Sequence, residues 1–186
     1  MERLISQIEN YTPFNEQEAQ DKSQILTFLR SGAALITRDN PVVHMTASAW
    51  VVSPDRKQVI MVYHNLYKSW SWMGGHADGD WNLLQVAKKE VMEECGLQDL
   101  TVISPDIFSL EILSVAGHEK KGTYLSSHLH LNVTYLFEAD PAQPLRIKPD
   151  ENSAVGWVAV EDIPEKTSEV WFRDRIYSKL CTKTGC

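Results

Sequence analysis

Three glutamates lie close together in a predicted helix, and their spacing is suited to metal chemistry. They are Glu90, Glu93 and Glu94. At about 100° of rotation per residue these side chains share one helix face, beside the apolar stripe that contains Ala87 and Val91. Mg²⁺ takes oxygen ligands from a few carboxylates and keeps positions for water and substrate phosphates. The spacing therefore predicts a site for a divalent cation.

A glycine-rich segment, GGHADGD at residues 74–80, precedes this helix. Its glycines permit backbone conformations and close approaches that larger side chains block, so a main-chain carbonyl of the segment can also reach a cation. The helix itself is predicted between Asn82 and Cys95, with Gly96 as its stop. The segment and the helix together form one candidate site.

These two segments resemble the Nudix box, G-x5-E-x7-R-E-U-x-E-E-x-G-U, in which U is a bulky aliphatic residue. With the box glycine placed on Gly75, the other matching positions are Glu90, Val91, Glu93, Glu94, Gly96 and Leu97. Two positions depart from the box. Trp81 replaces its first glutamate and offers no oxygen ligand, although Asp78 and Asp80 are nearby carboxylates that can compensate. Lys89 replaces its arginine and keeps the charge without the planar fork.

The resemblance implies a fold and an activity. The fold is an α/β class fold, the Nudix-like α/β/α sandwich with a mixed β-sheet, over residues 41–186, preceded by an N-terminal helical extension at residues 1–40. The activity is Mg²⁺-dependent hydrolysis of a phosphoanhydride bond in a nucleoside diphosphate linked to another moiety, with Mn²⁺ as a substitute cation.

The resemblance also implies roles for individual residues. Glu90 and Glu94 are the expected first metal ligands, assisted by Glu93 and by the carbonyl of Gly74. A carboxylate must take a proton from the attacking water. Glu93 is one candidate for this catalytic base, and Glu151 is the other, because it precedes a predicted strand where the family places a downstream acidic site.

Five further side chains are candidates for substrate binding: His76, Lys89, Trp72, His128 and His130. His76 and Lys89 suit phosphate contacts, and Trp72 either stacks on a ring or fills the core. His128 and His130 share one face of a predicted strand, where they contact substrate, form a ligand pair or simply face solvent. A transition-metal site is disfavoured because no cysteine or third histidine is near them in sequence.

The rest of the chain reads as strands interleaved with helices, which predicts a layered α/β fold. Alternating or apolar runs predict five strands, at residues 45–51, 59–63, 107–115, 128–137 and 155–160. Helices are expected up to about Arg30, at residues 82–95 and at residues 168–179. The last of these is expected to bring Val170, Trp171 and Ile176 into the core.

Composition limits the partners and the location. The chain has 186 residues, a net charge of -7 and three cysteines, Cys95, Cys181 and Cys186. The negative charge disfavours a nucleic acid polymer but allows a small phosphorylated nucleotide-like substrate at a bound cation. With no apolar run of membrane length and no CxxC spacing, we expect a cytoplasmic protein that does not bind membranes. A homodimer is compatible with the sequence.

Two other functions are open alternatives. The first is a catalytically silent Nudix-like module that binds a nucleotide or a regulatory partner, which the departures at Trp81 and Lys89 favour. The second is a diphosphate isomerase of related fold, which requires a catalytic cysteine near the metal. Cys95 is the only cysteine near the box, and its position on the apolar stripe predicts a packed thiol.

Overall fold

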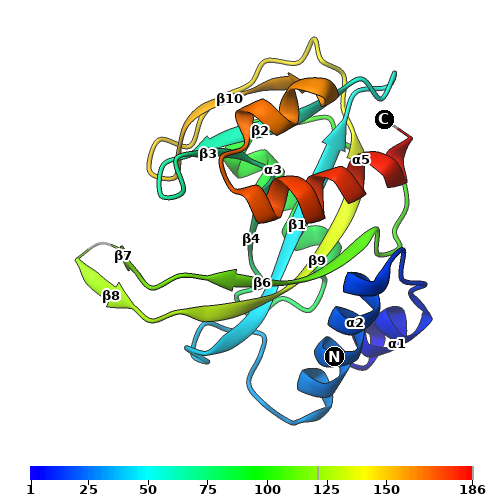
Figure 1. Ribbon diagram of the computed structural model, residues 1–186, viewed down its shortest axis with the longest axis vertical. Coiled ribbons are helices and arrows are strands. Elements are labelled where there is room, and N and C mark those ends of the chain that lie inside the picture. Colours follow the sequence, from blue (N-terminus) through cyan, green and yellow to red (C-terminus); the bar gives the residue numbers. More distant parts are fainter. Residues whose placement is uncertain (121, 186) are drawn as a thin grey trace. The chain divides into compact units, whose positions relative to one another are not determined.

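Residues 1–120 and 122–185 are described in the computed structural model of the protein (Figure 1), and their contacts divide the chain into two units. The first unit comprises Met1–Ser48, Gly75–Val86 and Asp106–Tyr135. The second unit comprises Ala49–Gly74, Ala87–Pro105 and Leu136–Cys186. Strands are hydrogen-bonded in the order β10-β2-β1-β9-β5, with β3 paired to β2, β4 to β1 and β6 to β9.

Two helices begin the first unit, α1 (Glu2–Asn10) and α2 (Glu16–Arg30). The side chain of Asn15 caps α2 by accepting a hydrogen bond from the Glu18 backbone N–H at 3.0 Å, which satisfies a free donor at the helix start. The end of α2 at Arg30 confirms the predicted helix boundary. The N-terminal helices expected from the sequence are therefore present.

Strands of the first unit bring distant segments together. They are β6 (Ser109–Val115), the hairpin β7 (His118–Lys120) and β8 (Thr123–Leu125), and parts of β1 (Val43–Val52), β4 (Met73–His76) and β9 (His128–Glu138). β6 runs antiparallel to β9, from the pair Ser109 and Thr134 to the pair Val115 and His128. The hairpin continues from the ends of β6 and β9 (Figure 1).

The polar face of β9 is not solvated. Asn132 and Thr134 alternate with apolar residues as expected, yet both are fully buried. Asn132 donates to Glu111 Oε2 at 2.9 Å, and Ser109 donates to Glu18 Oε1 of α2 at 2.7 Å. Because the N-terminal helix packs on β6, this face becomes a buried hydrogen-bonded network, whose polar groups are satisfied by one another.

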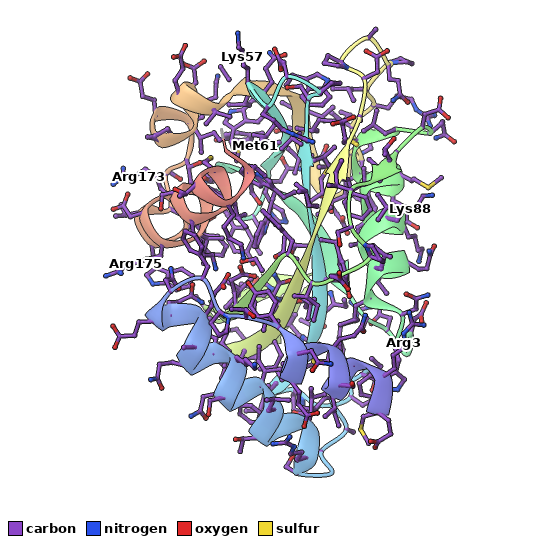
Figure 2. The ribbon with its side chains drawn as sticks, turned by 90° about the vertical axis from the view of Figure 1, so that its right-hand side faces the viewer. Arg3, Lys57, Met61, Lys88, Arg173 and Arg175 are labelled. Atoms are coloured by element: carbon purple, nitrogen blue, oxygen red, sulfur yellow. The ribbon has the colours of Figure 1, made fainter. Side chains whose placement is uncertain are left out.

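The second unit contains antiparallel strands followed by short helices. Its elements are β2 (Gln58–His64), β3 (Ser69–Ser71), β5 (Thr101–Val102), β10 (Asn152–Ala159), η1 (Val160–Asp162), α4 (Ile163–Lys166), the π-helix η2 (Phe172–Tyr177) and α5 (Ser178–Thr184). β10 pairs with β2, so that Trp157 lies opposite Ile60. Met61 of β2 is fully buried, whereas Lys57, just before the strand, points outward (Figure 2).

The C-terminal helical segment differs from the prediction in which side chains it buries. Ile176 is fully buried as expected, but Val170 is 57% exposed and Trp171 is 45% exposed. Val170 and Trp171 lie at the start of the helical segment, before the π-helix that carries Ile176, so the burial of Ile176 does not bring them into the core. Tyr177, the last residue of the π-helix, is also in the core, where its ring stacks on Trp50 with centroids 5.7 Å apart.

Helix α3 (Leu83–Cys95) ends where the sequence predicts. Gly96 follows with φ of 77°, a left-handed conformation that stops the helix. A Cβ added to Gly96 would lie 3.0 to 3.1 Å from the side chain of Arg146. Gly96 is thus required both for its backbone conformation and for this close approach.

We expect Gly96→Ala to lower the free energy of unfolding by about 2 kcal/mol, because alanine is strained at positive φ and meets Arg146. Gly32→Ala is the matched control: Gly32 has the same φ of 77° but no atom within 4 Å of an added Cβ. It should cost about 1 kcal/mol. Urea unfolding of both variants measures the difference, and equal losses would show that Arg146 contributes nothing.

Candidate functional site

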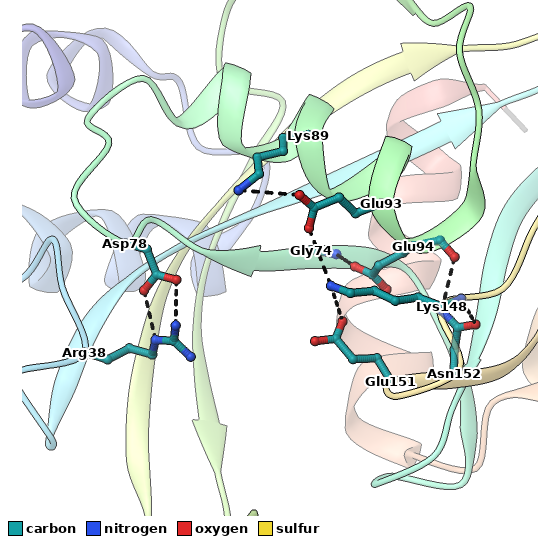
Figure 3. Close-up of polar contacts among 9 residues, drawn as sticks. All are labelled: Arg38, Gly74, Asp78, Lys89, Glu93, Glu94, Lys148, Glu151 and Asn152. Carbon is teal, nitrogen blue, oxygen red and sulfur yellow. Dashed lines mark hydrogen bonds and ion pairs between the residues drawn. The ribbon is translucent and has the colours of Figure 1, made fainter.

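The glutamates of α3 lie in the second unit, and the most enclosed of them is Glu94. Glu94 is only 4% exposed, Glu90 is half-buried and Glu93 is exposed. The backbone N–H of Gly74 donates to Glu94 Oε1 at 3.0 Å (Figure 3). The end of the glycine-rich approach and the helix thus meet at this carboxylate.

Burial makes negative charge at these carboxylates costly. It raises the pKa of Glu94 to about 8, with the Gly74 N–H opposing the shift and Glu90 adding to it. Burial also raises the pKa of Glu90, partly opposed by the Lys148 ammonium. Two adjacent carboxylates that lack enough positive charge fit a hard divalent cation, which binds oxygen and would offset that cost. The donor set therefore suits Mg²⁺.

Lys148 joins the carboxylates of this site. Its Nζ lies 3.0 Å from Glu151 Oε2 and 3.5 Å from Glu93 Oε2 (Figure 3). Burial would lower the pKa of Lys148, but Glu151, Glu90 and Glu93 raise it above its ordinary value. Lys148 was not among the residues predicted from the sequence, although its position three residues before Glu151 was a usable signal.

The loop that carries Glu151 is fixed to α3 by Asn152. Asn152 is fully buried, and its Nδ2 donates to the Glu94 carbonyl at 3.2 Å. Its Oδ1 accepts from the Lys148 backbone N–H at 3.1 Å, and the Glu151 carbonyl accepts from the Asn65 N–H at 3.0 Å. These bonds bring Glu151 beside the helix glutamates, as its predicted role requires. The role itself stays a prediction.

Two predicted substrate-binding residues of the second unit have structural partners. Lys89 is 70% exposed and pairs with Glu93 one turn further along α3, with Nζ and Oε1 3.5 Å apart. Trp72 is 7% exposed, and its ring packs edge-on against Phe172 and Tyr177. The Trp72 ring thus fills the core of this unit, and substrate contact by either residue stays a prediction.

The two aspartates expected to compensate for Trp81 are engaged within the first unit. Asp78 accepts two hydrogen bonds from Arg38, at 2.9 and 2.7 Å (Figure 3). Asp80 Oδ1 accepts from the Asn82 N–H at 2.8 Å, just before α3. Their carboxylates orient the turn and the helix start, which gives them a structural use.

The predicted histidines also lie in the first unit, where the structure adds one that the sequence analysis missed. His76 on β4 and His130 on β9 each lie close to His44 of β1, with ring centroids 5.1 and 4.9 Å apart. His128 lies 5.1 Å from His44. No third histidine is near His128 and His130 in sequence, but the fold brings His44 of β1 to them from a distant position in the chain.

Cys95 does not act as an exposed nucleophile. It is fully buried, burial raises its pKa to about 11, and its Sγ donates to the Val91 carbonyl at 3.0 Å. A thiol with a raised pKa carries little thiolate at neutral pH. This argues against the isomerase alternative. Cys186 lies outside the described residues.

The raised pKa of Glu94 predicts how stability depends on pH without metal. Because the folded-state pKa is about 8 against an ordinary 4.5, the folded chain holds a proton there that the unfolded chain has lost. The free energy of unfolding should therefore fall as pH rises from 4.5 to 8, by on the order of 4 kcal/mol. Urea unfolding in a chelator should show a weaker fall for Glu94→Gln; identical pH profiles would contradict the account.

Comparison with known proteins identifies the family to which the chain is similar. A family model described as the NUDIX domain matches residues 42–180. A search of curated protein sequences finds no match.

Among the described residues, no helix combines the length and the apolar character needed to cross a membrane.

Solved structures share the fold. An Ap4A hydrolase from C. elegans in a binary complex is 18% identical with a TM-score of 0.54, covering 76% of this chain and 94% of that one. A Nudix hydrolase from M. Smegmatis is 15% identical with a TM-score of 0.54, over 76% and 86% of the two chains. The dihydroneopterin triphosphate pyrophosphohydrolase of E. coli is 13% identical with a TM-score of 0.54, over 74% and 94%. The predicted Nudix-like fold is confirmed.

Proposed function

Because the chain belongs to the Nudix hydrolase family, we propose that it is a Mg²⁺-dependent pyrophosphohydrolase that cleaves a phosphoanhydride bond in a nucleoside diphosphate linked to another moiety. The observation that carries the proposal is the enclosed carboxylate of Glu94 beside Glu90, with the Gly74 N–H directed at it. These residues hold the metal, with Mn²⁺ as a substitute. Glu93 and the Gly74 carbonyl complete the proposed ligand set.

Mg²⁺, when bound, neutralises the diphosphate and polarises an attacking water. The chain's own residues prepare this site. The Gly74 N–H fixes the orientation of the Glu94 carboxylate, and Asn152 ties the Glu94 backbone to the loop of Glu151. A site held by such contacts stabilises developing charge without reorganising during the reaction.

A carboxylate takes the proton of the attacking water, and Glu151 and Glu93 are the two candidates. Both form ion pairs with Lys148, but Glu93 also pairs with Lys89 on the exposed side of α3. Glu151 is less exposed and lies on a loop anchored by Asn152 and Asn65. We therefore favour Glu151 as the base and Glu93 as a residue that assists the metal ligands.

The substrate class is a small phosphorylated nucleotide-like molecule. Lys89 supplies positive charge to its phosphates, His76, His128 and His130 are polar candidates for contacts to it, and Trp72 is the aromatic candidate. We also propose a cytoplasmic location, without a membrane or a nucleic acid polymer as partner; the negative net charge of the chain supports the absence of nucleic acid. A homodimer is compatible with this function.

The proposal is tested by a substrate screen with Mg²⁺ or Mn²⁺, read out as phosphate release after coupling to a phosphatase. Nucleotide sugars, coenzyme diphosphates and nucleoside triphosphates belong in the panel. Two of the similar structures are an Ap4A hydrolase and a dihydroneopterin triphosphate pyrophosphohydrolase. Ap4A and dihydroneopterin triphosphate are therefore added to the panel, because both contain phosphoanhydride bonds. We expect release that stops in a chelator. Nucleotide binding by calorimetry with no release from any compound would instead favour the silent module.

A further inference from the structure

We propose that His44, His76 and His130 form a binding site for a transition-metal cation of the zinc type. The three side chains come from β1, β4 and β9 of the first unit. Each offers one ligand nitrogen, and these nitrogens all lie within 4.8 Å of one another. This site is additional to the carboxylate site of the proposed function and does not depend on it.

The geometry is close to that of a zinc centre. Zn–N bonds of about 2.0 to 2.1 Å place tetrahedral ligand nitrogens about 3.4 Å apart. Small side-chain rotations are enough to bring the three histidine nitrogens from within 4.8 Å of one another to this separation. Backbone hydrogen bonds between the strands fix the main chain next to each of the three histidines. The Ala77 N–H donates to the Met45 carbonyl at 3.1 Å, next to His76 and His44, and the Leu129 N–H, next to His130, donates to the Val42 carbonyl at 2.9 Å.

His44 provides an independent indication of a ligand. It is 4% exposed, and its Nδ1 lies 3.0 Å from the Asn40 carbonyl, to which it must donate. The neutral ring then carries its lone pair on Nε2. That atom is buried and has no hydrogen-bond partner among the described residues. Buried polar atoms are nearly always satisfied, and a metal-binding histidine typically donates its other N–H to a carbonyl in this way.

His128 gives His130 the same kind of support. The Nδ1 of His128 lies 2.8 Å from the Ser126 carbonyl, and its Nε2 lies 3.1 Å from the Nε2 of His130. With both rings neutral, His128 donates to Ser126 and accepts from His130. The proton of His130 is then on Nε2, which leaves a lone pair on Nδ1 for a cation. His128 acts as a positioning residue.

The charge state of the cluster favours a cation over a phosphate. Burial, reinforced by the neighbouring imidazoles, lowers the pKa of His130 to about 2, and burial also lowers the pKa of His44. Both are therefore neutral at pH 7, which is the form that binds metal and does not attract anions. The nearby Arg38 is already paired with Asp78. Imidazole nitrogens suit zinc-type cations, whereas Mg²⁺ prefers oxygen.

The test uses the untagged full chain, stripped of metal and then titrated with Zn²⁺ in excess Mg²⁺, which occupies the carboxylate site. We expect one Zn²⁺ per chain by elemental analysis, and a visible absorption band from nitrogen-coordinated Co²⁺ bound in its place. His76→Gln and His130→Gln should each weaken Zn²⁺ binding at least about 100-fold. These half-buried positions are chosen because His44 is packed in the core; circular dichroism confirms that each variant is folded.

Two control variants separate this site from other sources of binding. His64→Gln changes the one histidine of the six that lies in the second unit, and Glu94→Gln changes the carboxylate site. Both should retain one Zn²⁺ per chain. Absence of Zn²⁺ binding by the wild type, or equal binding by His130→Gln, would overturn the proposal. The proposal would also be overturned if His76→Gln and His130→Gln lost binding of inorganic phosphate but kept binding of Zn²⁺. Zn²⁺ binding without hydrolysis would leave this site standing and remove only the proposed function.

Discussion

Glu94→Gln is expected to lower the Mg²⁺-dependent kcat/KM by about 10³-fold, or ~4 kcal/mol of transition-state stabilisation. Glu94 is the most buried of the proposed ligands, and the Gly74 N–H already orients one of its oxygens. Glutamine has nearly the same shape but cannot supply the negative charge that holds the cation. Removing a buried carboxylate whose pKa is raised to about 8 should leave the metal-free fold intact.

The measurement is phosphate release at saturating Mg²⁺, beside calorimetric titration with Mg²⁺ and a urea unfolding curve. Glu161→Gln, an exposed glutamate of η1 in the same unit, is the matched control and should retain wild-type activity. A Glu94→Gln protein that is folded and turns over at the wild-type rate would remove Glu94 from the metal site.

Glu151→Gln should reduce kcat by about 10²- to 10³-fold and leave the affinity for Mg²⁺ within a few-fold of the wild type, because it removes the proton acceptor and not a metal ligand. The amide keeps the shape of the loop, which Asn152 and Asn65 anchor through backbone contacts. Hydroxide can replace a missing base. The residual activity of this variant should therefore rise steadily with pH.

Glu93→Gln is the comparison for this result, since both carboxylates contact Lys148. We expect it to lose less than about 10-fold in kcat, mainly through weaker Mg²⁺ binding. The reverse pattern, with Glu93→Gln losing kcat and gaining rate with pH while Glu151→Gln remains active, would assign the base to Glu93.

The helices and strands that were predicted correctly were those with a local signal in the sequence. The helix bearing the glutamates could be bounded because its apolar stripe has helical period and Gly96 adopts the left-handed conformation that ends it. The strands at β1, β2, β6, β9 and β10 were visible because runs of apolar or alternating residues are local properties too. The family resemblance rested on this same helix and its approach.

Properties that depend on pairing between distant segments could not be predicted in this way. His44 joins His130 only because β1 and β9 come together, and Lys148 meets Glu93 only because its loop folds onto α3. Asn132 and Thr134 of β9 are buried because their side chains bond to Glu111 of β6, the strand on which α2 packs. The π-helix at Phe172–Tyr177, which carries the buried Ile176 and Tyr177, is a further feature that no helical-wheel argument from α-geometry foresees.

Hydrolysis in water enriched in oxygen-18 tests the central claim most directly. With Mg²⁺ and the best compound of the screen, mass spectrometry of the two products reports where the water oxygen goes. Attack of water at phosphorus predicts one oxygen-18 in one of the two phosphate-containing products for each bond cleaved, and none in a chelator. Substrate that is bound but recovered intact, or cleavage products whose phosphates carry no oxygen-18, would contradict a Mg²⁺-dependent phosphoanhydride hydrolase.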